Sequence, residues 1–422
     1  MDRDISPPPV KRGKITPAQK QNESNLPLHN PPTFSKTLRL FSWNINGIEP
    51  FLPPSDKKIT SFFKPKNSQN QPEKEPPPSA SLRAFLARHN WPEVLFLQEV
   101  KIKHGDTKTL ASLLSAVNTP LNSTDELASD RTYTLDTVLP EDKYNARGCG
   151  GKLYGVTTLI RKDFAQEYVV SARSVPWDLE GRVCVVELHP YHPPSPFSFS
   201  SSPSSSLSSN DRKDKDEGRK RKRGGGYNPL ALLNIYAVNG TSAPYRSPET
   251  GKIVGTRHDH KLAFHSRLRD ECLRLQEGGF QVVVAGDLNV ARGEGDGFPR
   301  LRTFPRQHCV NRVDFNGKFF GGEDNARARA YVGDSDGVDN AEKEGRCLDA
   351  VDVWRAMHGK ERRYTYHPRT SKKWGESCDR VDLIFVSRGL WESGRVIATG
   401  ILDSPQERGP SDHAPIWVEV GM

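Results

Sequence analysis

The chain has 422 residues, 34% of them hydrophobic, and a formal net charge of +9 at pH 7. It contains no run of about 18 apolar residues and no apolar N-terminal core, so neither a membrane span nor a secretory signal is expected. Six scattered cysteines without a C-x-x-C pair favour a reduced intracellular protein over a disulfide framework or a zinc site. The basic excess favours a polyanionic partner, because binding phosphates releases their counterions.

The first half of the chain alternates polar, proline-rich segments with apolar ones. Residues 1–36 have no hydrophobic periodicity and predict a disordered basic N-terminal tail, and residues 50–79 predict a disordered insertion. Strands are expected at 37–45 and 94–99, and helices at about 81–89 and 106–118.

The second half adds further apolar strands, another low-complexity segment and two helices. Residues 190–226 run from a Pro/Ser tract into a charge block and three glycines, which predicts a second disordered insertion. Strands are expected at 155–162, 181–188, 230–238, 280–289, 381–387, 394–399 and 413–420, and helices at 257–277 and about 347–358. Because several strands follow one another without a helix, we expect one large α/β domain over 37–422 with mixed or antiparallel sheets.

The cluster Arg219–Arg223 within the second insertion concentrates part of the positive charge. Such a cluster is typical of a nuclear-localisation signal or a nucleic-acid contact, although a solvated charge run explains it about as well. We therefore predict a nuclear protein, with the mitochondrion as the alternative location.

Polar side chains gather where the expected strands end. Loops at strand ends are where rigid scaffolds display chemistry. One such residue alone would be a turn or cap residue, but here the same residue types recur at six strand ends. They are Asn44 and Asn46; Gln98, Glu99 and Lys101; Tyr236 and Asn239; Asp287 and Asn289; Asp382; and Asp412 with His413.

This set of residue types suits phosphodiester hydrolysis. Hard oxygen ligands such as Glu99, Asp412 and the Asn46 amide suit Mg²⁺, which would neutralise charge on a phosphate. Asp287 or His413 could act as the base for an attacking water, and Asp382 is the candidate that orients the imidazole. The neutral amides can hold phosphate or water without adding negative charge; they are Asn44, Asn239 and Asn289.

Seven motifs occur in an order that resembles a known family. They read LFSWNINGI, LFLQEVK, EGRVCVVEL, NIYAVNG, VVVAGDLNVA, DRVDLIFVS and PSDHAPI. The series resembles that of the exonuclease III-type abasic-site endonucleases of the endonuclease/exonuclease/phosphatase superfamily, from about residue 38 to 421. The resemblance implies a deoxyribonuclease I-like fold over 37–422: a four-layer sandwich of two packed mixed β-sheets flanked by helices.

The resemblance also implies an activity and partners. The expected enzyme is a Mg²⁺-dependent DNA repair nuclease, with Mn²⁺ as the alternative ion. It would hydrolyse the phosphodiester 5′ to abasic sites by metal-activated water and add 3′-phosphodiesterase or 3′→5′ exonuclease activity. Its expected partner is double-stranded DNA with abasic or 3′-blocked sites, and the expected state is a monomer.

Site roles follow from the resemblance, residue by residue. Asn46, Glu99 and Asp412 match the principal metal positions. Asp287 and Asn289 match residues that activate and orient the water, and they are candidates for holding a second ion. Further matches are Tyr236 near the phosphate, the Asp382–His413 pair, and Asn44, Lys101, Arg182 and Asn239, which shape the site or contact DNA. Surface salt bridges explain Lys101 and Arg182 nearly as well.

One pocket position departs from the family pattern. Many abasic-site endonucleases carry a tryptophan where this chain has Asp379, while Tyr366 is the expected second aromatic wall. A carboxylate there is unfavourable unless it points away or pairs with Arg380. Strict abasic selectivity is therefore in doubt, and a looser pocket would suit 3′-end cleaning or exonuclease action.

Two other readings of the sequence stay open. The first is another phosphoesterase of the same superfamily, such as an RNA deadenylase or a phosphatase. The second is a non-catalytic scaffold that binds DNA or the sliding clamp. A scaffold would be expected to have lost Glu99, Asp287 or His413, and this chain retains all three.

The segment 57–66 predicts a contact with the replication sliding clamp. Ile59, Phe62 and Phe63 have the spacing of the clamp-binding peptide, with Asp56 at its glutamine position. Apolar anchors in a flexible polar segment are typical of partner binding. We expect joint substitution of Phe62→Ala and Phe63→Ala to abolish clamp pull-down and leave nuclease activity intact. Unchanged clamp binding would refute the motif.

Overall fold

The structure is a computed structural model that describes residues 34, 36–53, 80–122, 124–125, 128–145, 154–190, 227–321, 346–369 and 377–422. The clamp-binding residues Ile59, Phe62 and Phe63 lie outside the described residues, as does the basic cluster Arg219–Arg223. The same holds for the first 33 residues and for 191–226, so the predicted tail and the second insertion stay predictions.

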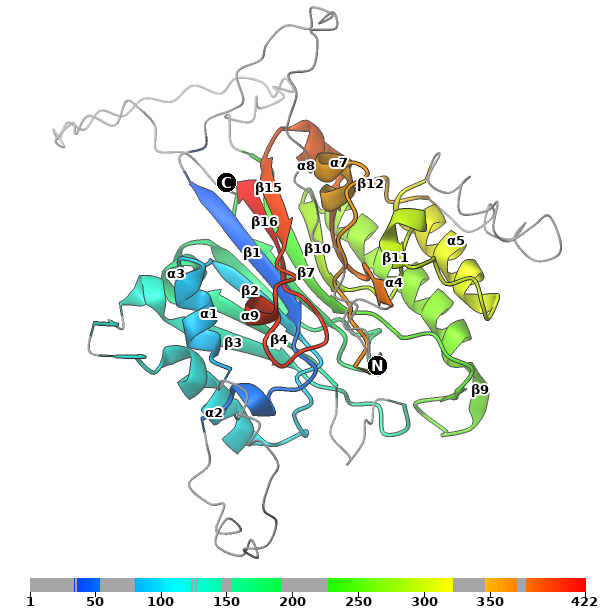
Figure 1. Cartoon of the computed structure of the whole chain (residues 1–422), viewed down its shortest axis with the longest axis horizontal. Coiled ribbons are helices and arrows are strands. Elements are labelled where there is room, and N and C mark those ends of the chain that lie inside the picture. Colours follow the sequence, from blue (N-terminus) through cyan, green and yellow to red (C-terminus); the bar gives the residue numbers. More distant parts are fainter. Residues whose placement is uncertain are drawn as a thin grey trace, which may run out of the picture. The chain divides into compact units, whose positions relative to one another are not determined.

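The first sheet holds both the first and the last strand of the fold (Figure 1). Its order is β15 (Val396–Ile401), β16 (Ile416–Gly421), β1 (Thr37–Asn44), β2 (Val94–Gln98), β4 (Val156–Arg161) and β3 (Tyr133–Val138). β1 runs parallel to β2 and antiparallel to β16. The sheet is therefore mixed, as the sequence predicted.

The second sheet is also mixed and carries the other strands whose ends are polar. Its order is β12 (Ala350–Asp352), β14 (Asp382–Ser387), β10 (Gln281–Asp287), β7 (Leu230–Tyr236), β6 (Val183–Leu188) and β5 (Val169–Arg173). β7 and β10 are parallel, and the other pairs are antiparallel. Two short ribbons pair β8 (Pro244–Arg246) with β9 (Ile253–Thr256) and β11 (Gly297–Phe298) with β13 (Cys378–Asp379).

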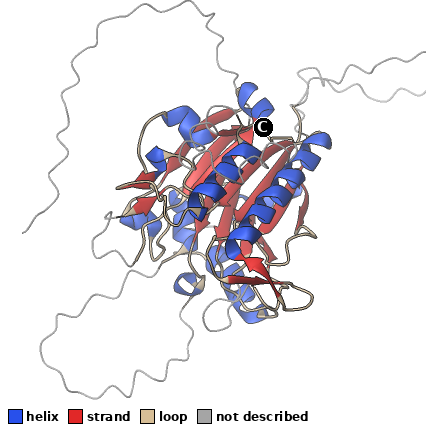
Figure 2. Cartoon of the chain, turned by 90° about the vertical axis from the view of Figure 1, so that its right-hand side faces the viewer, coloured by secondary structure: helices blue, strands red, loops and turns tan. Residues whose placement is uncertain are grey.

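The apolar side chains alternate between the two faces of each sheet, and this alternation builds the layers. In β1, Leu38 and Leu40 face the second sheet, whereas Phe41 and Trp43 belong to the outer cluster. That outer cluster includes side chains of α1 (Leu82–Arg88) and α2 (Thr107–Asn118). The outer face of the second sheet packs on α4 (Arg257–Glu277) and α5 (Gln307–Phe319). Helices thus cover both outer faces (Figure 1), and Figure 2 looks onto one of the two helical layers, which confirms the predicted four-layer fold.

Shorter helices complete the described ranges. They are η1 (Glu49–Phe51), η3 (Ser129–Arg131), α3 (Lys162–Tyr168), η5 (Glu294–Asp296), α7 (Val353–His358), α8 (Arg388–Glu392) and α9 (Pro405–Arg408). Within the part of the chain that is described, none of the helices has the length and apolarity to cross a bilayer.

The element predictions differ from the structure in three respects. The expected helix at 347–358 is divided, because Ala350–Asp352 pair with β14 as an edge strand before α7 begins. The expected insertion at 50–79 starts too early, since Phe51 is buried and its ring lies 5.2 Å from that of Trp43. Several further elements were not predicted, including β3, β5, α3 and α5.

A buried charge network ties the second sheet to the loops beside it. Arg380 places its guanidinium 2.7 Å from both Asp296 and Asp352, and Arg292 lies 2.8 Å from Asp352. Although burial favours the neutral carboxyl, Arg380 and Arg292 hold the pKa of Asp352 well below that of an ordinary aspartate. Arg380 likewise lowers the pKa of Asp296 against the effect of burial.

We expect Asp352→Asn to lower the free energy of unfolding by about 3–5 kcal/mol at pH 7, because the two guanidinium groups lose a buried partner. Asparagine keeps the side-chain oxygen that accepts a hydrogen bond from the Arg355 backbone N–H at the start of α7. The substitution therefore changes the charge and keeps this helix cap. The folded pKa lies below the unfolded value of about 3.9. The contribution is therefore complete above that value and is lost as the pH falls through the folded pKa.

Urea unfolding at pH 7 and at successively lower pH measures this effect. Asp349→Asn is the matched control, because Asp349 is 58% exposed and pairs with an exposed Arg388. We expect that control to change stability by less than about 1 kcal/mol. Equal effects of the two substitutions would contradict a structural role for the buried network.

Candidate active site

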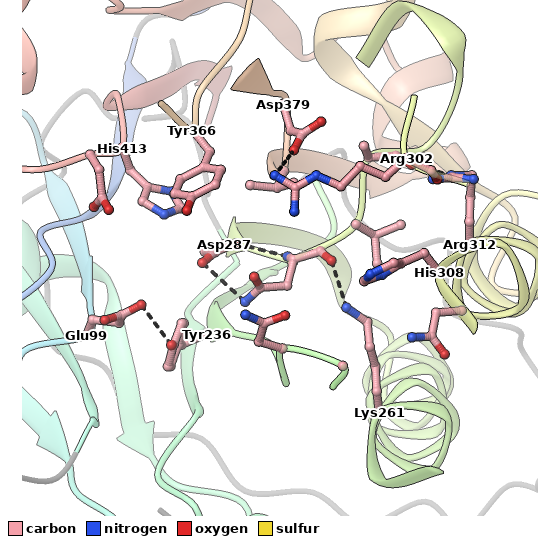
Figure 3. A pocket seen from close by; sticks show the side chains of 18 of the residues that line it. Glu99, Tyr236, Lys261, Asp287, Arg302, His308, Arg312, Tyr366, Asp379 and His413 are labelled. Atoms are coloured by element: carbon pink, nitrogen blue, oxygen red, sulfur yellow. Dashed lines mark hydrogen bonds and ion pairs between the residues drawn. The ribbon is translucent and has the colours of Figure 1, made fainter. Parts of the chain in front are cut away.

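A cavity of about 330 Å³ lies where β1, β2, β7 and β10 end (Figure 3). Parallel pairing of β1 with β2 and of β7 with β10 brings the carboxyl ends of these strands to matching edges. Most residues predicted for the site line this cavity; they are Asn46, Glu99, Tyr236, Asn239, Asp287, Asn289, Tyr366, Asp412 and His413. The other predicted site residues lie behind or beside it: Asn44, Lys101, Arg182 and Asp382.

Strand register places three polar residues side by side at the edge of the second sheet. Asp287 at the end of β10 pairs with Tyr236 of β7 on one side and Asp382 of β14 on the other. Gly286 allows this close approach, because a Cβ there would lie 1.9 Å from the Ile235 carbonyl oxygen. A side chain at position 286 would therefore push Asp287 out of register with Tyr236.

The loops that leave these strands share an uncommon backbone conformation. Asn46, Glu99, Lys101 and Asn289 all have φ between 52° and 54°, a region that residues other than glycine seldom occupy. Such conformations cost free energy and concentrate at functional sites. Each lies one to three residues beyond the last residue of its strand, where the chain turns at the cavity.

Hydrogen bonds between the two sheets fix the carboxylates at the floor of the site. Asn44 is fully buried and donates to Glu99 Oε1 at 3.2 Å and to Asp287 Oδ2 at 3.0 Å. The Tyr236 hydroxyl donates to Glu99 Oε1 at 2.8 Å. Beneath them, the Gln98 amide donates to Asn234 of β7 at 2.8 Å. The core between the sheets thus becomes polar as it approaches the cavity.

The predicted metal ligands are linked through Lys101. Its ammonium lies 2.9 Å from Glu99 Oε2 and also donates to Asn46 Oδ1, while Asn46 Nδ2 donates to Asp412 Oδ1 at 2.8 Å. Burial alone would raise the pKa of Glu99, but the Lys101 charge, together with hydrogen bonds from Lys101 and Tyr236, lowers that pKa. The Lys101 ammonium thus bridges Glu99 and Asn46, which are two of the three predicted oxygen ligands. Oxygen donors that already hold a cation also suit a hard divalent ion.

A second grouping of ligand atoms lies deeper. Among the described residues, Asp287, Asp382 and His413 bring one ligand atom each within 4.8 Å of one another. His413 Nδ1 lies 2.8 Å from Asp382 Oδ2, and this carboxylate, with Asp287, raises the pKa of the imidazole to about 10 despite burial. This hydrogen bond fixes the orientation of the imidazole, which suits it to proton and phosphate chemistry.

Asp287 is placed to exchange a proton. Burial, with the nearby Asp382 and Glu99 carboxylates, raises its pKa above that of an ordinary aspartate, although the His413 charge opposes this. The backbone N–H of Asn289 donates to Asp287 Oδ1 at 2.9 Å, and the side-chain Nδ2 of Asn289 donates to the Ala237 carbonyl at 2.9 Å. Both side chains are therefore fixed at the cavity wall.

Two residues predicted to shape the site or contact DNA, Arg182 and Asn44, lie behind the cavity wall. Arg182 is buried, with 3% of its surface exposed. Its charge is neutralised by Glu180, whose Oε2 lies 2.6 Å from the Arg182 Nε. Its guanidinium donates to the Tyr236 carbonyl at 3.1 Å and lies 4.7 Å from the Tyr236 ring centroid. Arg182 therefore positions Tyr236 and does not reach the cavity. Asn44 is likewise buried and hydrogen-bonds to Glu99 and Asp287, which is the site-shaping role that the sequence offered for it.

Asp379 is neutralised by a different arginine from the one considered in the sequence. Arg380 is committed to the buried network, and Asp379 pairs instead with Arg302 at 3.1 Å. The Tyr366 ring lies 4.8 Å from that of His413 and forms a wall of the cavity.

One side of the cavity is basic, and its residues were not predicted from the sequence. Its charged and polar lining comes from α4, from the loop before α5 and from α5 itself: Lys261, Arg302, His308, Asn311 and Arg312. The basic composition of 257–277 was visible in the sequence. The sequence did not reveal which of these side chains face the cavity, because no strand-end motif marks them.

Comparisons with known proteins agree with this architecture. The model of the Endonuclease/Exonuclease/phosphatase family matches residues 41–413. The Xenopus laevis APE2 catalytic domain is similar with a TM-score of 0.50 and 16% identity, over 91% of this chain and 92% of that one. AP endonuclease LMAP from Leishmania major gives 0.50 and 18%, over 92% and 89%. At these identities the likeness shows the fold. No curated protein matches the sequence.

We expect Mn²⁺ to bind the folded chain and Glu99→Gln to weaken that binding at least about tenfold. Even outer-shell partners of a metal contribute about 10- to 100-fold to its affinity, and Glu99 would lose its charge. Titration followed by electron paramagnetic resonance measures free Mn²⁺ directly. Glu392→Gln removes the same charge from the exposed end of α8 and serves as the control. Equal Mn²⁺ affinity of wild type and Glu99→Gln would exclude Glu99 as a ligand.

Proposed function

The chain belongs to the endonuclease/exonuclease/phosphatase family, as its motif series predicted, and on that basis we propose that it is a DNA repair nuclease. The proposed reaction is hydrolysis of the phosphodiester 5′ to an abasic site by activated water. Removal of 3′-blocking groups and 3′→5′ exonuclease action are proposed to use the same site.

The observation that carries this proposal is the arrangement around Asp287. Its raised pKa suits a group that accepts a proton from water at neutral pH. Asn289 fixes one carboxylate oxygen, and Asn44 the other. His413, protonated and held by Asp382, offers its second nitrogen to a phosphate oxygen in the same cavity.

The remaining polar residues hold the phosphate and the cation. Tyr236 donates to Glu99 and so keeps that carboxylate turned to the cavity. A Mg²⁺ or Mn²⁺ ion held by Asn46, Glu99 and Asp412 would neutralise phosphate charge and stabilise the leaving oxygen. Lys101 would give up its contacts with Glu99 and Asn46 when that ion binds.

DNA as the substrate is supported by charge and by likeness. The chain carries a net charge of +9, and basic side chains line one side of the cavity. One of the similar structures is described as an AP endonuclease. We further propose that the protein acts as a monomer in the nucleus, with the mitochondrion as the alternative. Clamp binding through Ile59, Phe62 and Phe63 stays a separate prediction.

The test is cleavage of a labelled duplex with one tetrahydrofuran abasic analogue and of a duplex with a 3′-blocked nick. We expect cleavage in Mg²⁺, none in EDTA, and a loss of at least about 100-fold in kcat for Asp287→Asn, as for removal of a general base. Asparagine keeps the shape of the side chain and removes its proton affinity. Asp349→Asn, remote from the cavity, should cleave like wild type.

The outcomes separate the possible activities. Cleavage of the blocked nick alone would assign the site to 3′-end processing. No cleavage of either duplex, or cleavage that Asp287→Asn leaves unchanged, would contradict the proposal.

A further inference from the structure

An ion pair spans the rim of the cavity at the position where the family resemblance leads one to expect an aromatic wall. Arg302 Nη2 lies 3.1 Å from Asp379 Oδ2. Figure 3 shows the Arg302 guanidinium reaching across the cavity toward the Tyr366 ring, with Asp379 beside it. Tyr366 in turn contacts His413, so the Tyr366 ring lies between the Arg302–Asp379 ion pair and the position proposed for the phosphate.

The two partners differ in their access to solvent. The Arg302 side chain is 50% exposed, whereas that of Asp379 is 7% exposed. A ligand in the cavity would therefore contact the Arg302 guanidinium, whereas the Asp379 carboxylate lies behind it. A guanidinium has five N–H donors. Among the described residues, Asp379 is the side chain that pairs with the Arg302 guanidinium. Donors remain for a ligand.

Both ends of Arg302 are held in place. Asp379 belongs to β13, and its backbone exchanges hydrogen bonds with Tyr366 at 2.8 and 3.1 Å. Arg312 donates to the Arg302 carbonyl at 2.8 Å and to the Ala291 carbonyl at 2.7 Å, which anchors the loop before α5. The guanidinium is thus positioned before any ligand arrives.

The other basic groups of the cavity are engaged or neutral. Lys261 is 2% exposed and donates to the Asn289 carbonyl at 2.7 Å. Arg312 is 4% exposed and holds the loop. Burial and neighbouring positive charges lower the pKa of His308 to about 4, so this ring is uncharged at neutral pH. Arg302 is therefore the exposed cation among the described residues that line the cavity.

We propose that Arg302, held by Asp379, recognises an anionic group esterified to the 3′ end of DNA, such as the carboxylate of a 3′-phosphoglycolate. This inference rests on the proposed function and names its preferred substrate class. With the phosphate at Asp287 and His413, the blocking group extends past Tyr366 to Arg302. A planar guanidinium binds a carboxylate through paired hydrogen bonds, which a neutral abasic sugar cannot form.

The reaction needs no further co-reactant. Water attacks phosphorus, and the bond from phosphorus to the 3′ oxygen breaks. The attacking water loses one proton and the leaving oxygen takes one up, which yields a 3′ hydroxyl and free phosphoglycolate. Arg302 binds the released group and takes no part in proton transfer.

Two matched substrates test this assignment. One nicked duplex ends in 3′-phosphoglycolate and the other in a 3′-ethyl phosphate, which keeps the diester and lacks the carboxylate. We expect wild type to prefer the phosphoglycolate about tenfold or more in kcat/KM, on the scale of a hydrogen bond to a charged group. Arg302→Ala should abolish this preference, mainly through KM. Because the readout is a ratio, partial unfolding of a variant does not change it.

Arg300→Ala is the matched control. Arg300 is exposed on the same loop and does not line the cavity, so the variant removes one positive charge without touching the site. It should retain the preference. A wild type that cleaves both ends equally, or an Arg302→Ala variant that keeps the preference, would overturn the inference and leave the nuclease proposal standing. Failure of wild type on both ends and on an abasic duplex would overturn the nuclease proposal itself.

Discussion

The register of β10 between β7 and β14 is the constraint on which the site depends. It lines up Tyr236, Asp287 and Asp382 along one edge of the second sheet. A slip of one residue would turn all of β10 over, since neighbouring side chains of a strand face opposite ways. The bonds from Asn44 to Asp287 and from His413 to Asp382 exist because that register holds.

The carboxylates that this arrangement gathers are kept in different charge states by their neighbours. Lys101 keeps Glu99 ionised, whereas burial and like charges favour the protonated form of Asp287. His413 carries the positive charge that Asp382 stabilises. One cavity therefore brings together an anionic carboxylate, a carboxyl group that favours its proton and a cationic imidazole. Separating such environments is how enzymes assign acid and base roles at neutral pH.

Much of this was accessible from the sequence, and the reasons for success and failure are physical. Asp287 and His413 could be predicted because they follow or precede apolar runs whose period identifies strands. The burial of Arg182 could not, because it depends on Glu180 and on the ring of Tyr236 folding around it. Arg302 lies in an irregular loop, so neither its partner nor its direction follows from any local pattern.

The pairing of β1 with β16 makes the catalytic centre dependent on both ends of the fold. Trp43 donates to the His413 carbonyl at 3.1 Å, and Asn46 donates to Asp412. Such pairing closes a very long loop, and long-range pairing of this kind slows folding. During synthesis the ribosome must release the segment around Asp412 before Asn46 gains its partner. A nascent chain would thus lack the complete candidate site until translation has passed β16.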